Sequence, residues 1–108
     1  MAEEKTKNKK DLRESFREFL FHLGDFLDVS ALIEHAGLEV LYVQEPQEAL
    51  NEMYAKGLVQ LGNFAYPVEI TFDIDLELVK VDSAIFSYRL TLNQMLKFLE
   101  EIREHGGA

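Results

Sequence analysis

The chain has 108 residues, a 47% hydrophobic content and a formal net charge of -9. This length and this apolar content predict one packed domain and exclude global disorder. The chain has no cysteine, which excludes disulfides and thiolate metal sites, and no apolar run reaches the ~18 residues that a membrane span needs. The first residues show no apolar leader, so we expect a cytoplasmic protein with no membrane partner.

Charge is distributed unevenly along the chain. Residues 1–17 contain six Lys and Arg against four Asp and Glu, a net charge of +2. Residues 18–79 contain only one Lys or Arg, Lys56, against twelve carboxylates. Because a phosphate backbone is bound through clusters of Lys and Arg, we expect no direct nucleic-acid binding by this acidic body. The charge favours a basic protein surface as the partner.

The N-terminal third is interpreted as a charged arm followed by two helices. Residues 1–10 have no apolar side chain after Ala2 and are expected to be a disordered basic arm. We expect the domain to comprise residues 11–105, with a disordered tail at 106–108. Over residues 12–27 apolar side chains recur every three or four positions, which predicts an amphipathic helix. Ser30 then predicts the start of a short helix over residues 31–36.

The middle of the chain is interpreted as a strand and a third helix. Residues 38–43 are rich in β-branched and aromatic side chains, which favours a strand. Pro46 is typical of a first helical turn, and Gly57 of a helix end. The apolar face predicted for this helix consists of Ala49, Leu50, Met53 and Tyr54.

Strand patterns dominate the segment that follows. Gly62 and Asn63 predict a two-residue turn after a strand at residues 58–61. Over residues 70–78 apolar and polar side chains alternate, which predicts one strand of about twelve residues. A turn at residues 82–83 and a return strand at residues 84–91 complete the expected hairpin.

The last helix begins at a clear sequence signal. Thr91 followed by Gln94 has the spacing of a capping box, and Gly106 marks the helix end. The predicted order is therefore α-α-β-α-β-β-β-α. We expect an α+β fold with about four mostly antiparallel strands and the helices packed on one face.

The acidic side chains of the long strand are the first candidate site. Asp73, Asp75 and Glu77 occupy alternate positions, so a regular strand would place them about 6.6–6.8 Å apart on one face. This face could simply be solvated, could dock on a basic protein, or could chelate Mg²⁺ or Ca²⁺ through oxygen. Lys80 follows Glu77 by three positions and would lie on the opposite face, which weakens a catalytic interpretation.

The aromatic residues of the first helix are the second candidate site. Phe16, Phe19, Phe21 and Phe26 lie within eleven residues. Such a set favours core packing or a dimer or partner surface, because aromatic residues are enriched in interface cores. The long hairpin could add an unpaired edge to the same surface.

No motif predicts catalysis. The serines lack a Gly-x-Ser-x-Gly elbow, and the three histidines are dispersed. We therefore predict a non-catalytic acidic binding module without cofactor or metal, acting as a homodimer. Its role would be that of an adaptor, a chaperone-like holder or an inhibitor of a basic partner. The alternative is a metal-dependent enzyme or sensor that uses the strand carboxylates.

Overall fold

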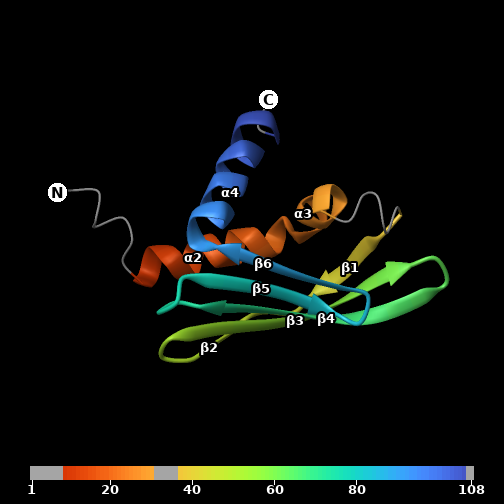
Figure 1. Cartoon of the computed structure of the whole chain (residues 1–108), viewed down its shortest axis with the longest axis horizontal. Coiled ribbons are helices and arrows are strands. Elements are labelled where there is room, and N and C mark those ends of the chain that lie inside the picture. The colour runs from red at the N-terminus through yellow and green to blue at the C-terminus, as the bar shows by residue number, and fades with distance from the viewer. Residues whose placement is uncertain (1–8, 31–36, 107–108) are drawn as a thin grey trace.

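The computed structural model describes residues 9–30 and 37–106, which form three helices and one six-stranded sheet (Figure 1). The helices are α2 (Lys9–Phe21), α3 (Leu23–Ser30) and α4 (Leu92–Gly106). The strands are β1 (Glu39–Val43), β2 (Gln47–Glu48), β3 (Glu52–Leu61), β4 (Phe64–Asp73), β5 (Leu78–Ser83) and β6 (Phe86–Thr91). Every strand pair is antiparallel and the helices pack on the sheet, which confirms the α+β prediction. None of the described helices combines the length and the apolar content needed to cross a membrane.

The sheet has more strands than the sequence predicts. Its order is β1–β3–β4–β5–β6, and β2 pairs with β3 along the same edge that β1 occupies. One additional strand, β2, lies where a helix was expected, and the other arises because the long predicted strand is divided into β4 and β5.

The helix predicted over residues 45–57 is wrong. Met53, Ala55 and Val59 are buried at alternate positions of β3, which is the period of a strand. Gly57 lies in the same series and does not end a helix. A Cβ atom at Gly57 would lie 2.5 Å from the backbone oxygen of Tyr42 on β1, so only glycine allows the two strands to approach this closely.

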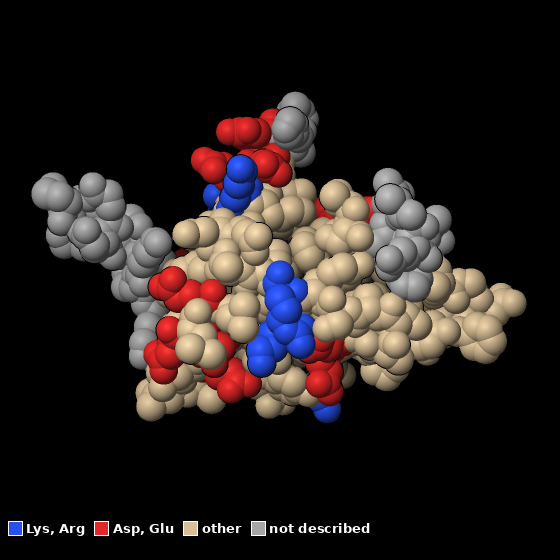
Figure 2. Space-filling model, viewed as in Figure 1, with Lys and Arg blue, Asp and Glu red and all other residues tan. Residues whose placement is uncertain are grey.

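The long strand predicted over residues 70–78 is also wrong, because a turn at residues 74–77 separates β4 from β5. The Asp73 carboxylate accepts a hydrogen bond from the Leu76 N–H at 3.0 Å, a contact that is typical of turns. Glu77 has φ = 53°, a left-handed conformation that non-glycine residues rarely adopt. Figure 2 shows carboxylates gathered at this end of the sheet, but they do not form a strand face.

The two remaining hairpin turns differ in how well they were predicted. The turn at Gly62 and Asn63 is confirmed, since Leu61 pairs with Phe64 across it and Gly62 has φ = 63°. The turn between β5 and β6 consists of residues 84–85, two residues later than expected.

The helices follow the predicted apolar pattern with different boundaries. The helix predicted at residues 12–27 is divided at His22 into α2 and α3, and α3 continues to Ser30. The short helix predicted at residues 31–36 lies outside the described residues. Lys9 and Lys10, predicted to belong to the arm, are the first residues of α2. The capping box of α4 is confirmed: the Gln94 N–H donates to Thr91 Oγ1 at 3.1 Å, and the Thr91 N–H donates to Gln94 Oε1 at 2.9 Å.

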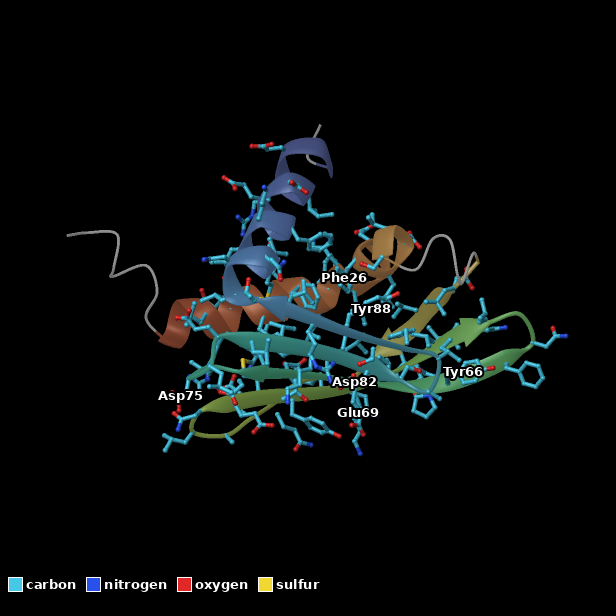
Figure 3. All side chains as sticks on the ribbon, in the orientation of Figure 1. Phe26, Tyr66, Glu69, Asp75, Asp82 and Tyr88 are labelled. Carbon is cyan, nitrogen blue, oxygen red and sulfur yellow. The ribbon has the colours of Figure 1, made fainter. Side chains whose placement is uncertain are left out.

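The core lies between the helices and one face of the sheet. Cross-strand rows of apolar side chains, such as Met53, Phe72, Val79 and Leu90, supply the sheet side. Phe16 of α2 packs its ring 5.5 Å from that of Phe72. The opposite face of the sheet carries polar side chains, including the cross-strand neighbours Glu69 and Asp82, which Figure 3 labels. One face therefore supplies the hydrophobic stabilisation and the other contacts solvent.

Candidate partner-binding groove

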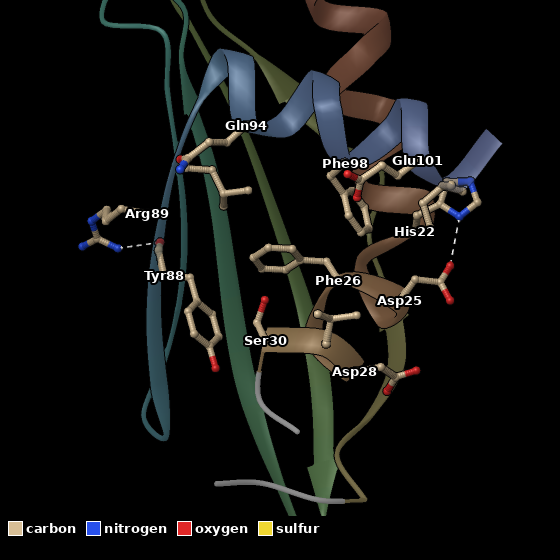
Figure 4. A pocket seen from close by; sticks show the side chains of 13 residues that line it. His22, Asp25, Phe26, Asp28, Ser30, Tyr88, Arg89, Gln94, Phe98 and Glu101 are labelled. Atoms are coloured by element: carbon tan, nitrogen blue, oxygen red, sulfur yellow. Dashed lines mark hydrogen bonds and ion pairs between the residues drawn. The ribbon is translucent and has the colours of Figure 1, made fainter. Parts of the chain in front are cut away.

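A groove of about 830 Å³ lies between α3, β6 and α4 (Figure 4). Its lining includes apolar and aromatic side chains from all three elements. They are Phe26, Val29, Tyr88, Leu90, Phe98 and Ile102. A volume of this size is within the range of binding sites for small molecules and peptide side chains.

Three aromatic rings form the floor of the groove. The ring of Phe26 on α3 lies 5.7 Å from Tyr88 on β6 and 5.7 Å from Phe98 on α4, in both cases edge to face. Phe26 is buried, whereas Tyr88 and Phe98 are half-buried. Edge-to-face packing of this kind stabilises a ring pair and holds the rings in a fixed orientation.

The groove exists because α4 leaves the sheet as soon as it begins. The capping box at Thr91 ends β6 and starts α4, which then points away from the sheet (Figure 1). Leu92, Met95 and Leu99 near the start of α4 are buried, but Ile102 near its end is only half-buried. The second half of α4 therefore forms a wall of the groove and is not fully covered by the core.

Carboxylates line the rim of the groove. Asp25, Asp28 and Glu101 are exposed and line it from α3 and α4. Asp25 lies 3.1 Å from His22 Nδ1, an ion pair when the imidazole is protonated. The rim on the helix side therefore carries excess negative charge around an apolar floor.

Arg89 on β6 also lines the groove, but its side chain points away from it (Figure 4). Arg89 on β6 donates a 2.8 Å hydrogen bond to the Asp82 carboxylate on β5. Partial burial of Asp82 by itself raises the pKa of that carboxyl group. Hydrogen bonds from Arg89 and Ser87, with the charges of Arg89 and Lys80, outweigh the burial and lower the pKa below its ordinary value. This ion pair holds the Arg89 side chain against β5.

The predicted acidic site is displaced from this groove. Asp73 ends β4, and Asp75 and Glu77 are exposed in the turn that follows, so a strand no longer aligns the three side chains. None of the three lines the groove. Among the described residues, no group of three His, Asp or Glu side chains is placed to hold a metal ion.

The predicted aromatic surface is mostly core. Phe16 and Phe19 are fully buried and Phe26 is 9% exposed, because the stripe that contains them faces the sheet. Phe21 lies off that stripe and is 84% exposed. Of the four residues, Phe26 alone lines the groove, and Phe21 alone is available on the outer surface.

Sequence reasoning did not predict that residues of α4 and β6 form two walls of a groove. Phe98 and Ile102 are four residues apart on α4 and so share a face next to the buried stripe. That spacing was a signal for an apolar wall. Tyr88 on β6 contacts Phe26 through tertiary packing that no local pattern shows.

Comparison with protein-family models, with curated proteins and with solved structures finds no match to this chain.

Proposed function

We propose that this protein is a non-catalytic binding module that holds a segment of a basic partner protein in the groove between α3, β6 and α4. The observation that carries the proposal is the combination of an aromatic floor, formed by Phe26, Tyr88 and Phe98, with a rim of exposed carboxylates. Apolar side chains of the partner would displace water from the floor. Its Lys and Arg side chains would face the rim, where opposite charge increases the association rate and the selectivity.

The proposal agrees with the charge of the whole chain. The net charge of -9 attracts a basic partner and repels an acidic one. The role would be that of an adaptor, a holder of an unfolded or extended segment, or an inhibitor. The metal-dependent alternative receives no support from the turn at residues 74–77, because its carboxylates lie along an exposed loop and do not converge in a cleft.

Homodimer formation remains a prediction. The two most exposed aromatic side chains of the described residues could form such a contact. They are Phe21 on α2 and Phe64 at the tip of the β3–β4 hairpin, which is 67% exposed. Sedimentation of the wild-type protein beside Phe21→Ser and Phe64→Ser tests it. Loss of a dimer in one variant would locate the contact, and a monomeric wild-type protein would reject the prediction.

The groove is tested with defined peptides. A phage-displayed library of random dodecapeptides is selected on the full chain, and the dissociation constants of the resulting synthetic peptides are measured by fluorescence anisotropy. Val29 is 77% exposed and lines the groove, so Val29→Asp should place a charge in the binding surface without disturbing the core. We expect binding to weaken about tenfold or more. The matched control is Leu76→Asp, at a residue that is 70% exposed and outside the groove.

The rim is tested separately by charge reversal. Glu101 lines the groove, whereas its neighbour Glu100 lines a different surface of α4. Glu101→Lys should weaken the binding of the selected peptides and reduce the salt dependence of that binding. Glu100→Lys should have a much smaller effect on both quantities. Peptides that bind Val29→Asp and Glu101→Lys as tightly as the wild-type protein would overturn the proposal.

A further inference from the structure

We infer that the partner segment binds as an extended strand that pairs with the free edge of β6, with alternate side chains in the groove. This inference rests on the proposed function and adds the conformation and the side-chain pattern of the partner. It follows from three features of the molecule: the hydrogen-bonding geometry of β6, the state of the other sheet edges, and the position of the groove beside β6.

Among the described residues, β6 is the last strand of the sheet, and no strand pairs with the backbone groups on its outer side. The β5–β6 hairpin has a two-residue turn, and Ser83 pairs with Phe86 next to it. In an antiparallel hairpin of this type the pair next to the turn exchanges hydrogen bonds, and every second pair does so thereafter. Ser87, Arg89 and Thr91 are at the intervening positions. Their N–H and C=O groups therefore point away from β5.

One of these outward groups is already used. The Thr91 N–H donates to the Gln94 side chain in the capping box at 2.9 Å, which agrees with the outward direction derived from the hairpin. Gln94 thus marks the end of the free edge. The backbone groups of Ser87 and Arg89 remain, and together they match a partner strand of about four or five residues.

The other edges of the sheet are less suited to strand addition. The edge strand β1 is irregular, with a register shift between Val40 and Tyr42. The part of β4 that extends beyond β5 contains Pro67, which has no N–H to donate. Bulges and prolines are devices by which proteins prevent unwanted strand pairing. Neither a register shift nor a proline occurs in β6, and no described strand covers its outer side.

The groove fixes which side chains the partner strand needs. Figure 4 shows β6 on one side of the groove and α3 on the other, so a strand added to β6 lies along the opening. Its side chains opposite Tyr88 and Leu90 would face the helices, since directly paired residues point to the same side of a sheet. Those positions require apolar residues. Lys or Arg at the ends of the segment would lie near Asp28 and Glu101 on the rim.

Charge favours a different protein over a second copy of this chain as the occupant. Two copies carry -9 each, and strand pairing through β6 would bring their acidic groove rims together. A basic segment is attracted by the same rim.

The inference is tested with a designed octapeptide in which valine alternates with threonine between terminal lysines. A scrambled peptide of the same composition, without the alternation, is the control. We expect the alternating peptide to bind at least about tenfold more tightly, and Val29→Asp to abolish the difference.

N-methylation of single peptide residues shows which backbone N–H groups of the peptide form hydrogen bonds, because each methyl group removes one donor. Methylation should weaken binding about tenfold at every second position and have little effect at the positions between.

A second measurement locates the contact on the protein. The amide hydrogens of Ser87 and Arg89 should exchange more slowly with solvent when the alternating peptide is bound, whereas the scrambled peptide should not protect them. An unchanged exchange rate, or N-methyl effects without a period of two, in peptides that still depend on Val29 would overturn strand addition and leave the proposed function intact. If no library or designed peptide depends on the groove, both proposals fail. Protection of Ser87 and Arg89 in the protein alone, with a doubled mass in sedimentation, would identify a second copy as the occupant and overturn the inference.

Discussion

The two edges of the sheet differ in how far other described segments cover them. At the first edge, β1 and β2 pair one after the other along β3, and side chains from α2 attach the connecting segment to the helix layer. Arg13 donates to the backbone oxygens of Ala49 and Leu50 at 2.8 and 3.1 Å. Arg17 forms ion pairs with Glu45 and Glu48, and both carboxylates raise the pKa of its guanidinium. At the second edge, no described strand pairs with the outer side of β6; Gln94 caps the backbone at its end, and the groove lies beside it.

This difference indicates which edge of the sheet can accept a partner. Backbone groups at an exposed edge pair readily with another chain, so proteins usually obstruct them. Here the obstruction is concentrated at the β1–β2 edge and on the extension of β4, while β6 remains regular. The apolar groove lies at that same regular edge. The following variants test whether the first edge depends on close packing and the second on a few local contacts.

The largest effect is expected from Gly57→Ala. The new Cβ atom would lie 2.5 Å from the Tyr42 backbone oxygen, so β1 would have to move away from β3. Displacing backbone in a packed region costs about 2–3 kcal/mol of unfolding free energy. Urea unfolding measures the loss. Gly24→Ala is the matched control and should cause no loss, because its new Cβ atom would meet only Val40 Cγ2 at 4.0 Å. A loss below about 1 kcal/mol for Gly57→Ala would show that β1 and β3 are not tightly packed against each other at this position.

The same glycine shows why part of the fold escaped prediction. Sequence reasoning treated Gly57 as a helix end because the preceding residues have apolar side chains at helical spacing. They also have the period of two that β3 adopts, and short segments commonly fit both patterns. The close approach of Tyr42 on β1 favours the strand over the helix at Gly57, and this is a contact between segments that are distant along the chain. A single sequence does not contain that information.

Features set by local chemistry were predicted well. The capping box at Thr91, the turn at Gly62 and the apolar stripe through Phe16 and Phe19 all follow from residues within a few positions of one another. The turn at residues 74–77 was missed because the alternating pattern continues through it. The Asp73 hydrogen bond and the positive φ of Glu77 are visible only in the structure. The groove was missed for the same reason as β3, since Phe26, Tyr88 and Phe98 meet only through tertiary packing.

A smaller effect is expected at the β6 edge from Thr91→Ala. This change removes the hydroxyl that accepts the hydrogen bond of the Gln94 N–H, and it should lower the free energy of urea unfolding by about 1 kcal/mol.

The companion variant Gln94→Ala releases the Thr91 N–H and extends the free edge. Hydrogen exchange at Thr91 should then become faster, while exchange in β4 stays unchanged. Equal exchange at Thr91 in Gln94→Ala and the wild-type protein would show that the side-chain hydrogen bond does not protect this amide.

At the first edge, Glu48→Gln should have a still smaller effect. Glu48 pairs with Arg13 at 3.3 Å and with Arg17, but its side chain is 38% exposed. Exposed pairs contribute little, so we expect a loss of about 0.5 kcal/mol at low salt that disappears at high salt. Glu100→Gln on α4 is the matched control for removing one negative charge. A large loss that persists at high salt would indicate that packing of the Glu48 side chain, and not its charge, holds β2.

The smallest effect is expected from Asp82→Asn beside β6, and it should appear only in the pH dependence. The pKa of Asp82 is lowered in the folded protein from its ordinary value of 3.8, so its ionised form stabilises the fold above that value. This contribution is lost as the pH falls through the lowered pKa. Wild-type stability should therefore decline more steeply than that of Asp82→Asn when urea unfolding is followed from pH 5 downward.

At pH 7 the two proteins should differ by only about 0.3 kcal/mol, because the pair with Arg89 is exposed. Identical pH profiles would mean that Arg89 does not hold the Asp82 carboxylate in solution. Arg89 would then be free to turn toward the β6 edge, where its charge would oppose the basic ends of a partner strand. The Asp82 pair thus keeps a positive charge on the outer side of β6 and leaves the groove side to the carboxylates of α3 and α4.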